Sequence, residues 1–157
     1  MADIHIADFY KDAARILIQL YNQFPRPTLL FVEDIAGPDT PDDFGLHSER
    51  HQACLATMLW LAKAGYIHYE SLVRQEALDQ ATLTQRGFTL LASRLPIVDV
   101  PGLTPPDEES LHGDQPAPEI ATQTNGANLL RQVLQYGSSM AIEQVMLTLL
   151  HQSRHHL

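Results

Sequence analysis

The stretch Ser48–Phe88, SERHQACLATMLWLAKAGYIHYESLVRQEALDQATLTQRGF, decides the fold of this chain. Ser48 can cap a helix, because its hydroxyl oxygen can accept a hydrogen bond from an amide two or three residues later. From Ala53 to Ala62 the sequence is apolar except for one threonine, which is typical of a buried helix. Gly65 is placed to end this helix, since glycine readily adopts the left-handed conformation found after a helix.

A β-hairpin is predicted after this helix. Tyr66–Val73 alternates in the manner of a strand, and Gln80–Thr84 can pair with it across a polar turn at Arg74–Asp79. Thr84 can then cap a last short helix that runs through Leu91. This order indicates a mainly α fold with a small β-hairpin.

The residues before this stretch add a first helix and a connection. Apolar residues recur at three-and-four spacing along Asp3–Phe24, which predicts a helix with one buried face. Pro25 and Pro27 end it, because proline lacks the amide hydrogen. For the apolar run Thr28–Ala36 we expect a short extended piece that passes into a helical turn. Gly37–Leu46, rich in proline, glycine and aspartate, predicts a loop.

Residues 1–93 resemble the winged-helix DNA-binding domains of the MarR and PadR kind. The resemblance is carried by the junction of the helix with Gly65-Tyr66-Ile67, and by Leu83-Thr84-Gln85-Arg86-Gly87-Phe88, which is similar to the L-T-x-x-G step after the wing of those families. It implies a winged helix-turn-helix, in which the third helix enters the major groove and the wing touches the DNA backbone.

Two segments follow this domain. Residues 94–125 contain six prolines and an acidic excess, which predicts a linker. Helical spacing returns in 126–157 after the expected cap Asn125, and Gly137-Ser138-Ser139 predicts one kinked helix or two helices in this C-terminal arm. The apolar stripe of the arm must be buried, either on the first domain or in a homodimer. The residues expected to form this contact are Met58, Trp60, Leu61, Leu130, Leu134, Ile142, Val145, Met146 and Leu149.

Composition indicates a folded chain that is acidic overall. The 157 residues are 45% hydrophobic, and the formal net charge is -9. The predicted wing carries Glu70, Glu76 and Asp79 against Arg74, and such acidity opposes approach to phosphates. The single cysteine, Cys54, excludes an intrachain disulfide. With no signal peptide and no apolar run of roughly 18 residues, a cytoplasmic location without a membrane span is expected.

Motifs for catalysis or metal binding are missing from the sequence. It has no phosphate-binding loop, nucleophile elbow or HExxH, which argues against an enzyme. His151 and His155 are four residues apart, but two ligands do not make a zinc site, and the other histidines are scattered singly. We therefore expect no metal and no cofactor.

Two functions remain open. The first is a dimeric DNA-binding transcriptional regulator, and the second is a winged-helix module for protein interaction that does not bind DNA. A minor third reading is a regulator with a small-molecule pocket near Met58, Trp60 and Tyr66. The residues expected to contact double-stranded DNA are Arg26, Ser48, Arg50, His51, Gln52, Lys63, Arg74 and Gln75.

Overall fold

The computed structural model describes residues 4–96 and 123–154 of the chain. It is mainly helical with a small antiparallel sheet, and it divides into two compact units, Met1–Thr89 and Leu90–Leu157. Most of the predicted linker, residues 97–122, lies outside the described residues.

Three helices of the first unit pack together, of which the sequence predicted two as helices and one as a helical turn. They are α1 (Ile4–Gln23), α2 (Val32–Ala36) and α3 (Glu49–Lys63). The apolar stripe of α1 is buried, and Ser48 caps α3 by accepting a hydrogen bond from the amide of His51. An extended segment, residues 28–31, leads directly into α2. This confirms the expected short extended piece that passes into a helical turn.

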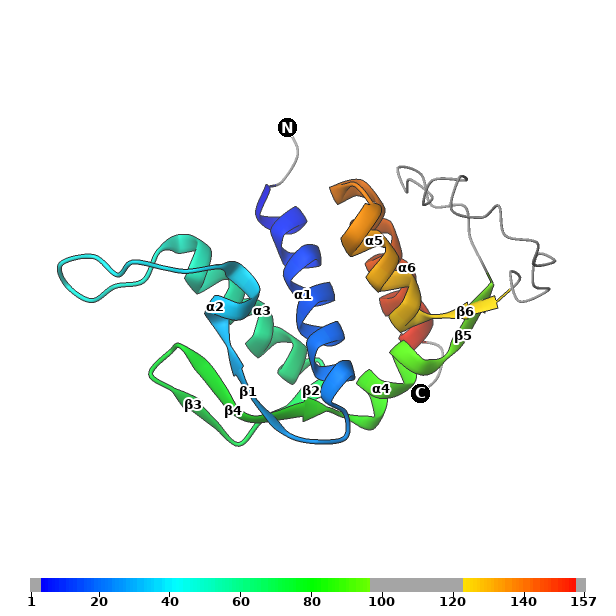
Figure 1. The fold of residues 1–157 in the computed structure, drawn as a ribbon, viewed down its shortest axis with the longest axis horizontal. Helices are drawn as coiled ribbons and strands as arrows, with labels where there is room; N and C mark the ends of the chain where they lie inside the picture. Colours follow the sequence, from blue (N-terminus) through cyan, green and yellow to red (C-terminus); the bar gives the residue numbers. More distant parts are fainter. Residues whose placement is uncertain (1–3, 97–122, 155–157) are drawn as a thin grey trace, which may run out of the picture. The chain divides into compact units, whose positions relative to one another are not determined.

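Four short strands form one antiparallel sheet around β4 (Figure 1). The strands are β1 (Thr28–Phe31), β2 (Ile67–His68), β3 (Ser71–Val73) and β4 (Ala77–Leu83). Strand β4 pairs with β1 on one side and with β2 and β3 on the other. Leu78 is thus opposite both Leu30 and Leu72.

The predicted turn at Arg74–Asp79 was too long. The observed turn is residues 74–76, between the end of β3 and the start of β4. Arg74 and Gln75 at its tip both have positive φ, and the amide of Glu76 donates to the carbonyl of Val73. Strand β4 starts earlier than predicted because Ala77 and Leu78 pair with β1 as well as with β3. The alternating pattern of the hairpin does not show that β4 also pairs with β1.

The end of α3 and the start of α4 (Gln85–Ala92) meet at one junction. The amides of Gly65 and Tyr66 donate to carbonyls of the last turn of α3, and Gly65 has a φ of 87°. The hydroxyl of Thr84 donates to the carbonyl of Gly65 and accepts from the amide of Gly87. Thr84 and Gly65 therefore act as the cap and the stop that the sequence predicted.

The second unit holds a strand pair and two helices. Strands β5 (Arg94–Pro96) and β6 (Gln123–Asn125) pair antiparallel, so both ends of the segment predicted as linker are regular structure. Asn125 caps α5 (Gly126–Tyr136), and α6 (Ser139–Arg154) follows after a break at Gly137-Ser138. The second of the two expected forms, a helix pair, is the one observed.

Gly87→Ala should destabilise the protein. A Cβ on Gly87 would overlap the carbonyl oxygen of Tyr66 and press on Leu83. An alanine normally stabilises a helix by about 0.5–1 kcal/mol relative to glycine, whereas overpacking costs about 1–3 kcal/mol. We expect a lower free energy of unfolding in urea. Gln85→Ala, at an exposed position of the same helix, should have little effect, and equal stability of the two variants would contradict the junction described here.

Candidate functional site

Arg50, one of the predicted DNA contacts, is paired with a buried acid inside the first unit. Its guanidinium donates two hydrogen bonds to the carboxylate of Asp12 on α1, at 2.6 and 2.5 Å. The Asp12 side chain is 1% exposed and that of Arg50 is 34% exposed. This carboxylate raises the pKa of Arg50 above its ordinary value. Arg50 therefore ties α3 to α1.

The other predicted contacts in the first turns of α3 are also engaged within the fold. His51 is 2% exposed, and its Nε2 lies 2.9 Å from the carbonyl oxygen of Gln75 at the hairpin tip. Ser48 caps the helix. The side-chain amide of Gln52 donates to the carbonyl of His47, although the residue itself is exposed.

The remaining predicted contacts lie at the surface. Arg26, Lys63, Arg74 and Gln75 are exposed, and Gln75 belongs to the hairpin tip together with Arg74. Glu70 and Glu76, on the same hairpin, are exposed as well. Arg74 therefore shares the ribbon with exposed carboxylates.

The exposed side of α3 is apolar and hollowed. Six residues line an open hollow of about 580 Å³, and they are Ala56, Leu59, Trp60, Ala62, Lys63 and Tyr69. Trp60 is 43% exposed. Lys63 is the one charged residue among these six. The sequence predicted Trp60 and Lys63 as site residues but neither Leu59, their neighbour on α3, nor Tyr69. The approach of Tyr69 depends on how the chain turns after Gly65.

Aromatic neighbours hold Trp60 in place. Phe9 meets its ring edge to face at 5.1 Å between centroids, and Tyr66 lies 6.4 Å away on a nearly parallel plane. Arg86 lies over the Tyr66 ring at 4.9 Å from its centroid. Tyr66 and Met58 are buried and do not line the hollow, so of the three residues of the small-molecule reading only Trp60 does.

Most of the predicted packing residues are buried within one chain. Trp60 is the exposed exception and Leu134 is half-buried, whereas the others are 5% exposed or less: Met58, Leu61, Leu130, Ile142, Val145, Met146 and Leu149. The homodimer stays a prediction, and these side chains are covered without it.

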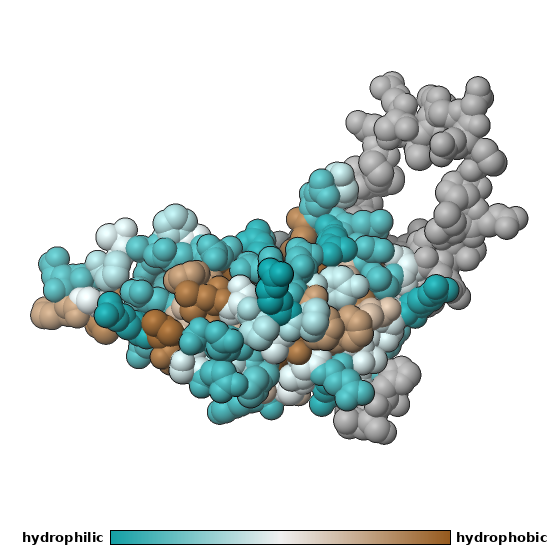
Figure 2. Space-filling model, turned by 60° about the horizontal axis from the view of Figure 1, so that its bottom comes forward, coloured by the Kyte–Doolittle hydropathy of each residue, from teal (hydrophilic) through white to brown (hydrophobic). Residues whose placement is uncertain are grey.

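Further hydrophobic side chains are exposed on the sheet. Leu29 and Phe31 of β1 and Leu72 and Val73 of β3 are each about 40% exposed. Figure 2 shows hydrophobic surface left of centre, in the region where Figure 1 places β1, β3 and β4. The ribbon therefore presents apolar as well as charged side chains.

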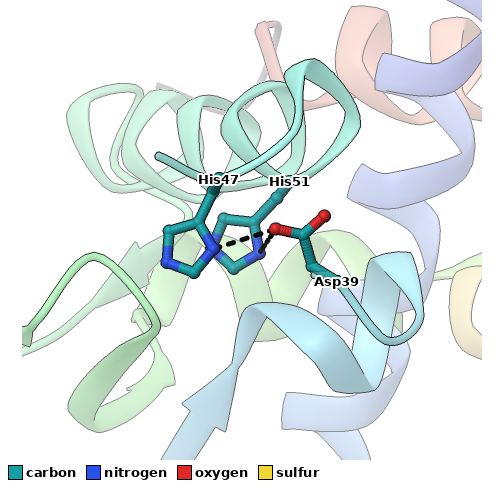
Figure 3. A group of neighbouring side chains, drawn as sticks. All are labelled: Asp39, His47 and His51. Carbon is teal, nitrogen blue, oxygen red and sulfur yellow. Dashed lines mark hydrogen bonds and ion pairs between the residues drawn. The ribbon is translucent and has the colours of Figure 1, made fainter. Parts of the chain in front are cut away.

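Asp39 and His47, which the sequence did not mark as site residues, meet the predicted DNA contact His51 beside the start of α3 (Figure 3). Asp39, His47 and His51 each offer one nitrogen or oxygen atom, and the three atoms lie within 4.8 Å of one another. Hydrogen bonds from Ser48 and then His47 lower the pKa of Asp39 from 3.8 to about 2. The four-residue spacing of His47 and His51 was the available signal, but Asp39 comes from the preceding loop.

The thiol of Cys54 lies inside the fold. It is fully buried in α3, and burial raises its pKa to about 12, so the nucleophilic thiolate is scarce at neutral pH.

Comparison with known families, curated proteins and solved structures finds no match for this chain. Among the helices in residues 4–96 and 123–154, none combines the length and the apolar character of a membrane span.

Arg50→Ala should destabilise the fold, because it leaves the buried carboxylate of Asp12 without its partner. Breaking a buried pair costs about 3–5 kcal/mol, and the partial exposure of Arg50 points to the lower end of that range. Urea unfolding followed by circular dichroism measures the loss. The exposed Arg26→Ala should change stability by less than about 0.5 kcal/mol. Equal values for the two variants would mean that the pair does not hold α1 to α3.

Proposed function

We propose that residues 1–93 form a winged-helix domain that binds a protein partner through the exposed face of α3. The order of elements supports the fold: a helix, a strand, two helices, and a ribbon whose last strand pairs with the first strand. In the resemblance to the MarR and PadR kind, α3 is the helix that reads a binding partner and β3–β4 is the wing.

The observation that supports a protein partner is the chemistry of the exposed face of α3. A helix that reads DNA needs side chains that donate to bases and phosphates in its first turns. Here Arg50 is held by Asp12, and His51 is buried against the hairpin tip. The hollow further along α3 offers alanine, leucine and aromatic surface instead. Such a surface gains free energy by losing water to an apolar partner.

The occupant that fits this hollow is an amphipathic helix of another protein. Helix-in-groove recognition uses aliphatic anchors from one face of a helix, and a partly exposed tryptophan is a frequent centre of binding energy. Lys63 is the charged lining residue, so an acidic side chain beside the anchors of the partner would complement it. The partner is therefore expected to carry leucine-like anchors and a nearby carboxylate.

Trp60 reports directly on this interaction, because it is the single tryptophan of the chain. A helical peptide of about 15 residues with leucines at i, i+3, i+4 and i+7 should shift its emission to the blue. A glutamate placed beside the leucines should bind a few-fold more tightly than a lysine at that position. Ala56→Arg should block both peptides by filling the hollow.

Charge reversal at Lys63 distinguishes specific docking from non-specific hydrophobic binding. Lys63→Glu should exchange the preference between the two peptides, whereas the matched control Arg74→Glu, an exposed cation on the hairpin tip, should leave it unchanged. The protein-binding proposal fails if neither peptide moves the Trp60 emission, or if Ala56→Arg binds as the wild type does.

DNA binding is the second candidate, and the order of elements together with exposed Arg26, Lys63 and Arg74 favours it. Under the first proposal, duplex DNA should bind only non-specifically, with a Kd of roughly 10⁻⁴–10⁻⁶ M that weakens steeply with salt. Fluorescence anisotropy at low and moderate salt measures this for the wild type and for Lys63→Ala plus Arg74→Ala. Arg50 is left intact because its loss affects folding. Tight, salt-tolerant binding that the double variant loses would favour DNA over protein.

The proposed role as a homodimeric regulator and a cytoplasmic location stay predictions. Light scattering of the full chain tests the homodimer, and a monomer at all concentrations would contradict it.

A further inference from the structure

The cluster Asp39–His47–His51 contains a buried nitrogen that has no hydrogen-bond partner among the residues that the structure describes. His51 Nδ1 is that atom, and its residue is 2% exposed. It faces the Oδ2 atom of Asp39 at 3.8 Å, which is too long for a hydrogen bond. Buried polar atoms are almost always paired, so this one requires a physical reason.

The protonation of His51 follows from its other nitrogen. Nε2 lies 2.9 Å from the carbonyl oxygen of Gln75, and a carbonyl can only accept, so Nε2 carries the hydrogen. In the neutral ring Nδ1 then holds a lone pair. That lone pair points at a carboxylate oxygen, and two electron-rich atoms facing each other are stabilised by a cation between them.

The second histidine completes the set. His47 Nδ1 lies 2.9 Å from the same Asp39 oxygen, and its ring stacks on that of His51 with 3.8 Å between centroids. Figure 3 shows the carboxylate of Asp39 directed at both rings.

We propose that Asp39, His47 and His51 bind one Zn²⁺ ion. Zinc takes imidazole nitrogen and carboxylate oxygen at about 2.0–2.2 Å, which places tetrahedral ligand atoms roughly 3.3–3.5 Å from each other. The observed separations of 2.9 and 3.8 Å lie on either side of that value. Three protein ligands leave the fourth position for water.

The hydrogen bond from His51 to Gln75 is the support that zinc-binding histidines usually have. A ligating imidazole donates its other N–H to a carbonyl or carboxylate, which fixes its tautomer and direction. His51 already has this arrangement. Its ring is therefore oriented for the metal, while the carbonyl it contacts belongs to the hairpin tip.

Binding requires one local change. Stacked parallel rings cannot both direct an in-plane lone pair at a single ion, so the His47 ring turns out of the stack. It lies before the helix cap, with its side chain 12% exposed, so it can turn more easily than the buried His51. If it binds through Nδ1, the neutral ring changes tautomer: the hydrogen that Nδ1 shares with Asp39 is lost from that nitrogen and Nε2 takes one up, so that the ligating nitrogen is free of hydrogen.

Isothermal titration calorimetry of the metal-free, tag-free full chain with ZnCl₂ tests the site. We expect one Zn²⁺ per chain and a rise in the thermal unfolding midpoint. CaCl₂ and MgCl₂ should not bind, since those ions prefer oxygen ligands. Cobalt(II) in place of zinc should give the visible absorption of a tetrahedral site.

Four variants assign the ligands. Asp39→Asn and His47→Gln should each weaken zinc binding by at least about 10-fold. His68→Gln is the matched control, because His68 also pairs with a carboxylate, that of Glu70, but at the exposed surface. A variant with His151, His155 and His156 all changed to Gln removes the C-terminal histidines and should bind as the wild type does.

The outcomes are decisive in both directions. Thermal melts without metal show that each variant is folded, so a lost affinity reports on the ligand. The zinc site is overturned if the wild type binds no zinc at micromolar concentrations, if Asp39→Asn and His47→Gln bind like His68→Gln, or if only the C-terminal variant loses binding.

Discussion

The first unit depends on the close contact between the turn that ends α3 and the start of α4. Gly65 turns the chain, the Tyr66 carbonyl lies against Gly87, and the Thr84 hydroxyl joins the two. The contact sets where β2 leaves α3 and where β4 ends, and therefore the register of the ribbon. Glycine is required at position 87 because the space that a side chain would need is filled by the backbone.

The ion pair between Asp12 and Arg50 explains why α3 is not a simple basic reading helix. Arg50 would be the natural base contact at this place in a winged-helix domain, but a bidentate pair with a buried carboxylate keeps it within the fold. The apolar residues further along the helix are left exposed together with Trp60. One helix thus combines a structural cation with an exposed apolar face, and this combination is the basis of the proposed protein partner.

The histidine cluster connects three parts of the unit that are separate in the sequence. Asp39 comes from the loop after α2, His47 and His51 flank the cap of α3, and Gln75 belongs to the hairpin tip. An ion held by the first three would restrain that loop and, through the Gln75 carbonyl, the tip. The proposed zinc site is therefore next to the ribbon of the proposed binding domain, and occupancy of the site could adjust the position of the tip.

Local sequence signals determined the helices and their ends. The caps Ser48, Thr84 and Asn125 and the stop at Gly65 were predictable because each satisfies backbone groups within a few residues. The tip at Arg74–Gln75, the partner of Arg50 and the approach of Asp39 to His51 were not predictable. Each of these contacts is made with a part of the chain that is distant in the sequence. Residue spacing describes neighbours along one helix or strand and not contacts between elements. Only the tertiary structure therefore decides them.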